Sequence, residues 1–227
     1  MRPRVHNIVS YTGALLVFWG VLSWRASALG VSLGAGLAAA LWTFHFARRT
    51  WESAFVHRYS KPRIGPGDYL TEYVYYWGFG AWIAWSVSAP LRPAPLVSLQ
   101  VLGLLLFVLA EAGNAHAHRV LRDLRSAGGR QRQIPRGLLF QRLSCPHYAF
   151  EISSWVGFNL VTQTWAGAAF MLVGGDLGRL GAQPSRRVSQ RVRRPRGPRA
   201  VSRRAPRADP VRVLSARAAC AQGLGNS

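Results

Sequence analysis

The sequence predicts an all-α fold, a polytopic helical membrane bundle, on three observations. Five apolar stretches are long enough, or nearly long enough, to span a bilayer. Polar connections that carry most of the charged residues join these stretches. The chain is 49% hydrophobic and yet has a formal net charge of +21, so its apolar and basic parts must lie apart. A helix satisfies its own backbone hydrogen bonds in lipid, and we therefore expect each stretch to be a helix.

The five predicted spans are roughly Ile8 to Trp24, Leu29 to Phe46, Tyr69 to Ser88, Leu96 to Gly113, and Ile152 to Val173. A buried core helix is the alternative for any single stretch, but five in succession favour a membrane bundle. The first stretch also resembles a signal peptide, because arginines precede it and Ala26-Ser27-Ala28 follows it. Four further spans follow, so we expect the first helix to be retained.

Charge placement predicts the orientation. If five helices alternate, one end of the bundle collects the arginines of the N-terminus and of two polar loops, residues 47 to 68 and 114 to 147. The other end carries only Arg25 and Arg92 before the C-terminal tail. The positive-inside rule makes the first end cytoplasmic, so chemistry carried by the two loops faces the cytosol.

The first polar cluster is "FHFARRTWESAFVHRYS", Phe44 to Ser60. Arg48 and Glu52 are four residues apart, so they can pair on one helix face. The alternative is a basic interfacial helix that contacts anionic lipid.

The second cluster is "GNAHAHRVLRDLRSAGGRQRQIP", Gly113 to Pro135. Glu111 and Asn114 end an apolar run, where polar groups are costly and indicate a functional site. Arg122 and Arg125 share a helix face, and arginine makes forked bonds to phosphate. The cluster therefore suits the phosphates of a nucleotide.

The third cluster is "SCPHYAFEISSW", Ser144 to Trp155, directly before the last predicted span. Its alternative is an interfacial belt of His and Tyr. No metal is expected, because a membrane di-iron site needs more histidines than the six in this chain. Cys145 and Cys220 match no zinc spacing and make no disulfide framework.

Five motifs, taken in order, resemble the steroid 5-alpha-reductase superfamily and, within it, the very-long-chain trans-2-enoyl-CoA reductases. They are "RRTWESAFVHRYS", "YYWGFGAWIAW", "GNAHAHRVLRDLR", "IPRGLLF" and "SCPHYAFEISSWVGF". The resemblance implies a helical membrane oxidoreductase that uses NADPH. It would reduce the 2,3 double bond of an acyl-CoA during fatty-acid elongation, as a multi-pass protein of the endoplasmic reticulum. Expected partners are membrane lipid and other elongation enzymes, whereas nucleic acid is not expected.

The resemblance also assigns roles to single residues. Tyr148 would be the catalytic proton donor, with a pKa lowered by a nearby cation. Arg48 would act through its charge, since arginine does not readily release a proton. The residues that would bind NADPH are Asn114, Arg122, Arg125, His147 and Glu151. A steroid or polyprenol reductase, or a catalytically incomplete remnant of the family, remains an alternative.

The C-terminal part departs from the resemblance. We expect a membrane-embedded reductase domain at residues 1–175 and a basic, disordered tail at residues 176–227. An odd number of spans would place this tail on the non-cytoplasmic side, where the positive-inside rule disfavours arginine. Codons can be chosen so that Leu180 to Arg193, read one nucleotide later, encodes the family's W-A-x-x-x-H-x-x-Y-L-K-E-F. We therefore hypothesise a frame change around Val173 to Gly178, and a true alternative tail is the competing explanation.

Overall fold

The computed structural model describes residues 1–30, 32–59, 63–90, 94–126, 140 and 146–181. The described residues form six α-helices and one π-helical turn, η1 (Glu52–Val56). The helices are α1 (Pro3–Leu29), α2 (Leu33–Trp51), α3 (Pro66–Val87), α4 (Val97–Ser126), α5 (Pro146–Thr162) and α6 (Trp165–Gly181). The predicted all-α class is confirmed.

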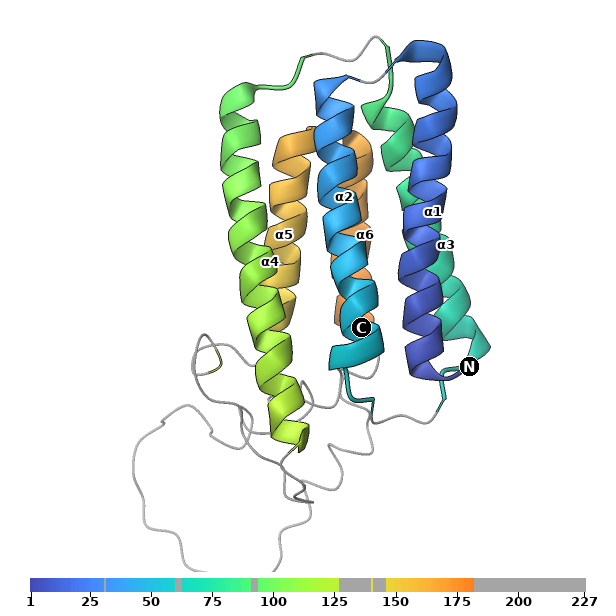
Figure 1. Ribbon diagram of the computed structural model, residues 1–227, viewed down its shortest axis with the longest axis vertical. Coiled ribbons are helices and arrows are strands. Elements are labelled where there is room, and N and C mark those ends of the chain that lie inside the picture. Colours follow the sequence, from blue (N-terminus) through green and yellow to red (C-terminus); the bar gives the residue numbers. More distant parts are fainter. Residues whose placement is uncertain (31, 60–62, 91–93, 127–139, 141–145, 182–227) are drawn as a thin grey trace, which may run out of the picture.

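The six helices run alternately up and down in one bundle (Figure 1). In that view the N-terminus lies at the lower end, together with the α2–α3 connection and the end of α4. Helices α1 and α2 stand side by side at the front, with α4 on the other side of α2. Helices α5 and α6 lie behind them. The ends of α2 and α4, which carry Arg48, Arg49, Arg119 and Arg122, therefore lie at the lower end, as the charge pattern predicts.

The fifth predicted span, Ile152 to Val173, is wrong as a single helix. Helix α5 ends at Thr162, Gln163 adopts the left-handed conformation with φ 48°, and α6 begins at Trp165. The amide of Gln163 accepts a hydrogen bond from the Leu96 backbone nitrogen at 3.1 Å and donates to the Leu96 oxygen at 3.0 Å. These bonds fasten the turn to the start of α4 and satisfy backbone groups there.

An even number of helices changes the expected position of the tail. Because α6 runs back down the bundle, it ends at the same end as the N-terminus (Figure 1). The expectation that the tail leaves from the opposite end is therefore wrong. Residues 182–227, with the shifted-frame segment, lie outside the described residues. The boundary at residue 175 stays a prediction.

Aromatic side chains fill the centre of the bundle. Trp42 is fully buried, and its indole nitrogen donates to the Ala14 oxygen at 3.2 Å. Its ring stacks on Phe18 with centroids 5.1 Å apart. On the α4–α5 side the backbones meet closely, because a Cβ on Gly103 would lie 2.6 Å from the oxygen of Gly157. Glycine at these two positions thus sets the spacing of α4 and α5.

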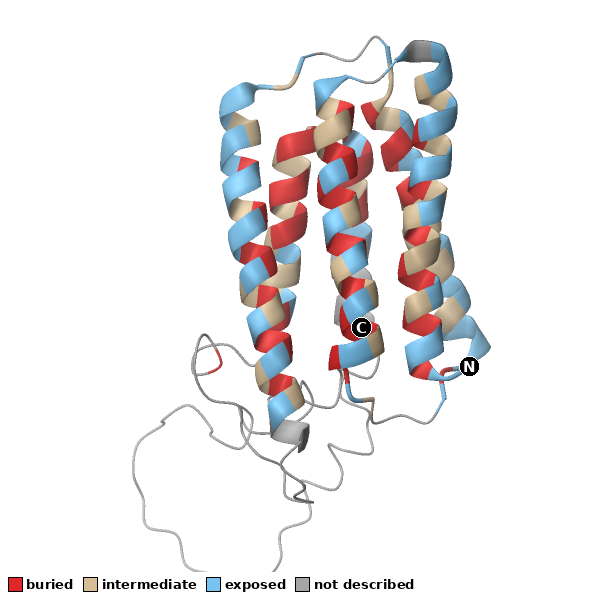
Figure 2. Ribbon diagram, in the orientation of Figure 1, coloured by how far each residue is buried: buried red, intermediate tan, exposed pale blue. Residues whose placement is uncertain are grey.

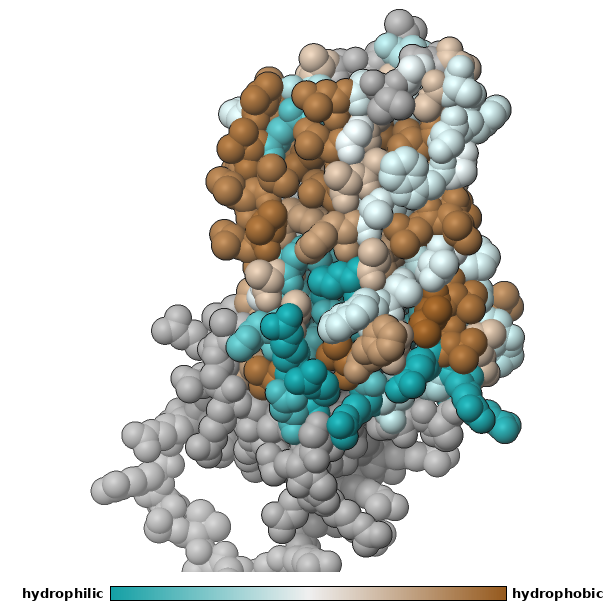
Figure 3. Space-filling model, in the orientation of Figure 1, coloured by the Kyte–Doolittle hydropathy of each residue, from teal (hydrophilic) through white to brown (hydrophobic). Residues whose placement is uncertain are grey.

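The outer surface is apolar over much of its height. Buried side chains line the inner faces of the helices, whereas the outer faces are exposed (Figure 2). Figure 3 shows apolar side chains over the upper part of the drawn face and polar ones towards the lower end. Two segments, Pro3–Ala28 and Val97–Asp123, are long and apolar enough to cross a membrane. Exposed leucines and valines along α4 suit contact with lipid rather than water.

Candidate active site

A buried polar cluster occupies the lower half of the bundle, between α2, η1, α4 and α5. Its members come from the three polar segments of the sequence and are almost completely buried, apart from the partly buried Arg48 and Glu151. They are His45, Arg48, Arg49, Glu52, His57, Glu111, Asn114, His118, His147 and Glu151. Such groups are costly inside a bundle unless they are paired, and the contacts below pair most of them.

Arg48 bridges two carboxylates of the polar cluster. Its Nη1 donates to Oε1 of Glu52 at 2.6 Å, which is the pairing that the four-residue spacing predicts. Its Nε donates to Oε2 of Glu111 on α4, also at 2.6 Å. The remaining nitrogen, Nη2, is buried and has no hydrogen-bond partner among the described residues. The guanidinium therefore keeps one buried donor available.

His45 and Asn114 connect the clusters of α2, α4 and α5. His45 contacts Oε1 of Glu111 through Nδ1 at 2.7 Å and Oε1 of Glu151 through Nε2 at 3.3 Å. The Asn114 amide nitrogen donates to the His147 backbone oxygen at 2.9 Å and to Oε2 of Glu151 at 3.0 Å. The Asn114 Oδ1 atom is buried and has no partner in the described part of the chain. The polar cluster thus contains a buried acceptor on Asn114 as well as the buried donor of Arg48.

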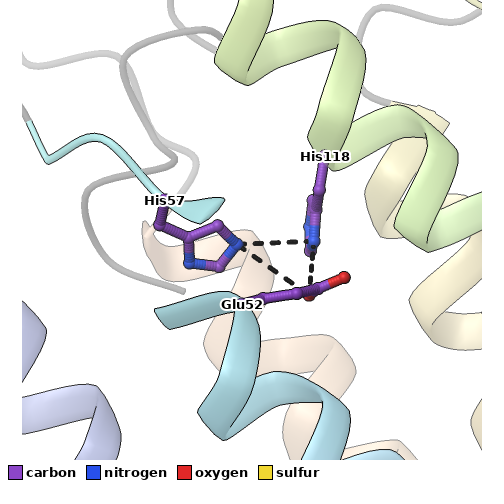
Figure 4. Close-up of side chains that lie close together, drawn as sticks. All are labelled: Glu52, His57 and His118. Carbon is purple, nitrogen blue, oxygen red and sulfur yellow. Dashed lines mark hydrogen bonds and ion pairs between the residues drawn. The ribbon is translucent and has the colours of Figure 1, made fainter. Parts of the chain in front are cut away.

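Glu52, His57 and His118 form a compact triangle (Figure 4). His118 Nδ1 lies 2.8 Å from Oε2 of Glu52, and His57 Nε2 lies 3.4 Å from His118 Nδ1 and 3.9 Å from Oε2 of Glu52. Ligand types and spacing of this kind suit a metal ion. However, Nη1 of Arg49 lies 3.3 Å from both His118 Nδ1 and Oε2 of Glu52. A fixed cation already balances this carboxylate, so the geometry supports an ion-pair network more than a metal centre.

The charges around this triangle shift two pKa values. Burial raises the pKa of Glu52, but the hydrogen bond and charge of His118 and the charges of Arg49 and Arg48 outweigh burial and hold it far below its usual range. Burial, assisted by the charge of Arg49, lowers the pKa of His57 to about 2. At neutral pH Glu52 is therefore ionised and His57 is neutral.

The predicted site residues divide into three groups. The structure brings Arg48, Asn114, His147 and Glu151 together in the polar cluster. Arg122 lies two turns further along α4, at its lower end, where Nε donates to Asp123 at 2.8 Å. The side chain of Arg125 and the "IPRGLLF" motif, except Phe140, lie outside the described residues.

Tyr148 lies at the start of α5, before the apolar part of that helix. It is 38% exposed, and its ring lies over His147 with centroids 4.3 Å apart. Burial of the rest of the side chain raises the pKa of its hydroxyl, while Arg49 opposes this and Glu151 adds to it. The expected lowering of the pKa is therefore wrong. A raised pKa still keeps the proton on the hydroxyl at neutral pH, as a proton donor requires.

Sequence reasoning missed Tyr11. This side chain lies on α1, is 1% exposed, and accepts a hydrogen bond from Nη2 of Arg49 at 3.1 Å. It stands in the first predicted span between Ser10 and Thr12, and no charged residue near it in the sequence marks it. Glu52 and His118 belong to the family motifs, whereas His45 lies in the first polar cluster and Glu111 lies in the apolar run before the second. Only the structure shows that these four residues meet in one network.

Comparisons with known proteins agree with the motifs. Residues 69–177 match the family described as 3-oxo-5-alpha-steroid 4-dehydrogenase. The Dictyostelium discoideum very-long-chain enoyl-CoA reductase is 38% identical over 143 residues, which are 63% of this chain and 48% of that protein. The chain belongs to the steroid 5-alpha-reductase superfamily. Within this superfamily it is also 43% identical over 70 residues to a steroid 5-alpha-reductase of Gossypium hirsutum, across 31% of this chain and 27% of the relative.

The enoyl-CoA reductase branch of the superfamily matches over the longer range. A Caenorhabditis elegans protein named probable very-long-chain enoyl-CoA reductase is 39% identical over 141 residues, 59% of this chain and 46% of the relative. The chain therefore spans about half the length of these two relatives. Membership in a family of membrane reductases, together with the two long apolar helices, makes the chain an all-α membrane protein.

Proposed function

We propose that this protein reduces the 2,3 double bond of a trans-2-enoyl-CoA with NADPH, in the elongation of very-long-chain fatty acids. The two relatives named very-long-chain enoyl-CoA reductases support the substrate class. The observation that carries the proposal is the pair of unsatisfied buried atoms, the donor Nη2 of Arg48 and the acceptor Oδ1 of Asn114. Buried polar atoms normally have partners, so both atoms suit a polar ligand.

These residues fit a nicotinamide cofactor. A carboxamide offers both a donor and an acceptor, and Oδ1 of Asn114 is a buried acceptor held in place by the bonds from its own amide nitrogen to Glu151 and His147. Asn114, Glu151 and His147 would hold the nicotinamide end. Arg122, and by its position on the same helix Arg125, would hold the phosphates. When bound, NADPH supplies the hydride for the reaction.

The residues of the chain then handle charge and protons. Reduction adds a hydride to the β carbon and a proton to the α carbon, and negative charge develops on the thioester oxygen in between. Arg48 is fixed by Glu111 and Glu52, so its charge is preorganised to stabilise that oxygen in a site of low dielectric constant. Tyr148 would give its hydroxyl proton to the α carbon and recover one from water, to which it is partly exposed.

The location follows from the proposed topology. We place the six helices across the membrane of the endoplasmic reticulum, with the lower, arginine-bearing end in the cytoplasm. There the polar cluster would meet acyl-CoA and NADPH, and other elongation enzymes would supply the substrate. Residues 1–175 are the proposed reductase domain, and residues 176–227 the proposed basic tail.

Two alternatives remain within the proposal. The steroid 5-alpha-reductase relative supports a steroid double bond as the substrate, and a polyprenol double bond belongs to the same alternative. The C-terminal sequence, which departs from the family's W-A-x-x-x-H-x-x-Y-L-K-E-F motif, supports instead a remnant that keeps the bundle and lacks a complete cofactor site. The family match ends at residue 177, inside the range of the hypothesised frame change. Sequencing the transcript decides between a frame change and a different tail.

The test of the proposal measures binding and turnover on the purified full chain in detergent. We expect NADPH to bind, and NADPH oxidation to depend on a trans-2-enoyl-CoA rather than on a 4-ene steroid. Turnover of the steroid alone would replace the proposed substrate. Absence of NADPH binding would identify the remnant.

A further inference from the structure

We infer that the groove between α1 and α2 holds the fatty acyl chain of the substrate, an inference that rests on the proposed function. The groove has a volume of about 590 Å³. Its walls are Trp19, Leu22, Ser23 and Ala26 from α1 and Gly36, Ala39, Ala40, Thr43 and Phe44 from α2. Both helices stand side by side on the face shown in Figure 1.

The spacing of small residues creates the groove. On α2, Gly36, Ala40 and Phe44 follow one another at intervals of four residues and therefore share a helix face. A Cβ added at Gly36 would meet nothing within 4 Å, so the space beside this glycine is open. From Gly36 to Phe44 the groove runs about 12 Å along the helix, at 1.5 Å per residue.

The groove is apolar and lies within a predicted membrane-spanning segment. Its α1 wall belongs to Pro3–Ala28, one of the two segments long and apolar enough to cross a bilayer. The hydroxyl of Thr43 accepts a hydrogen bond from the indole of Trp19 at 2.9 Å, so these polar atoms satisfy each other. Such a lining suits a hydrocarbon chain.

The lower end of the groove lies one turn of α2 away from a member of the polar cluster. Phe44 forms part of the wall, and Arg48 lies one turn below it on the same face of α2. The buried Nη2 of Arg48 has no partner among the described residues. A ligand with an apolar tail and a carbonyl at its end satisfies both features, because the tail fills the groove while the carbonyl accepts from Arg48. The thioester of an acyl-CoA is such a ligand.

The first experiment fills the groove without disturbing the packing. Gly36→Leu places a side chain in open space inside the groove. Gly20→Leu is the matched control, because Gly20 also has nothing within 4 Å and does not line the groove. The substrates are trans-2-hexenoyl-CoA and trans-2-hexadecenoyl-CoA. We expect Gly36→Leu to lower kcat/KM at least tenfold for the long chain, and the short chain and the control to stay within twofold. Equal loss on both substrates, or none on the long one, overturns the inference.

The second experiment does not depend on turnover. Hexadecanoyl-CoA with a diazirine at the chain end is photo-crosslinked to the full chain, and the labelled peptides are mapped. We expect the label between Trp19 and Ala26 or between Gly36 and Phe44, with competition by hexadecanoyl-CoA but not by phosphatidylcholine. Equal competition by phosphatidylcholine identifies a groove for bulk lipid, and a label elsewhere identifies another site, so either result refutes the inference. If no enoyl-CoA is reduced, the proposed function fails. The crosslink still tests whether the groove binds the acyl chain.

Discussion

Arg48 on α2 and Glu111 on α4 form an ion pair at 2.6 Å inside the bundle, and each also bonds a second member of the polar cluster. The side chain of Glu111 is 2% exposed and that of Arg48 is 12% exposed. The two paired residues are 63 positions apart in the sequence. The pair fixes the charge that the proposed mechanism uses and holds α2 against α4.

Removal of Glu111 is expected to destabilise the bundle strongly. Glu111→Ala leaves Arg48 and His45 without this carboxylate, and breaking a buried pair typically costs about 3–5 kcal/mol. Asp123→Ala is the control, because the Arg122–Asp123 pair is exposed and such pairs contribute at most about 1 kcal/mol. Denaturant unfolding in detergent measures both. Similar losses of unfolding free energy in the two variants would show that the buried pair stabilises the bundle no more than the exposed pair does.

Tyr148→Phe tests the proton donor. The change keeps the ring on His147 and removes the hydroxyl, so loss of a general acid is expected to lower kcat about 100-fold to 10,000-fold. NADPH affinity should stay unchanged, because the hydroxyl is assigned to the substrate. A kcat equal to that of the parent means that another group supplies the proton. The same comparison on a chain with the family's reading frame restored tests whether the tail limits the rate.

Arg122→Ala and Arg125→Ala test the phosphate site. Loss of a charged hydrogen bond of about 1.5–3 kcal/mol raises the dissociation constant of NADPH at least tenfold. Arg119→Ala, an exposed arginine one turn earlier on α4, is the control and should change affinity little. Equilibrium binding to the purified chain measures all three. If all three variants bind NADPH like the parent, Arg122 and Arg125 are ordinary membrane-surface arginines.

The stability of the bundle is expected to fall with acidification below pH 6.5. His57 has a pKa of about 2 in the folded chain, against an ordinary value of 6.5. Between these values the unfolded chain binds more protons, so stability is fully present above pH 6.5 and decreases as pH falls towards 2. One such group contributes at most about 1.4 kcal/mol per pH unit. Unfolding between pH 7 and pH 5 should become less pH-dependent in His57→Gln than in the parent, and an unchanged pH dependence would contradict this assignment to His57.

The triangle of Glu52, His57 and His118 is expected to bind metal only when Arg49 is removed. In the parent, Arg49 lies 3.3 Å from Oε2 of Glu52 and from His118 Nδ1, so a divalent cation meets a fixed positive charge. Arg49→Met removes that charge and should increase affinity for Zn²⁺, measured by calorimetry. Stoichiometric zinc in the purified parent, or chelator-sensitive activity, contradicts this prediction.

The sequence alone indicated the all-α class, the family and most members of the polar cluster. Apolar runs define the helices locally, and motifs such as "RRTWESAFVHRYS" keep their polar residues at helical spacing. The Arg48–Glu52 pair was predictable because both residues lie on one helix, where spacing fixes distance.

Tertiary structure decided the contacts that spacing does not fix. No Pro or Gly marks the turn at Gln163, because bonds to Leu96 on another helix hold it, so the apolar run looked like one span. The sequence does not distinguish Tyr11 from the other aromatic residues, whereas the packed bundle places its hydroxyl within hydrogen-bond distance of Arg49. The unsatisfied atoms of Arg48 and Asn114 are likewise properties of the packed bundle, because an atom lacks a partner only when neighbouring helices exclude water from it.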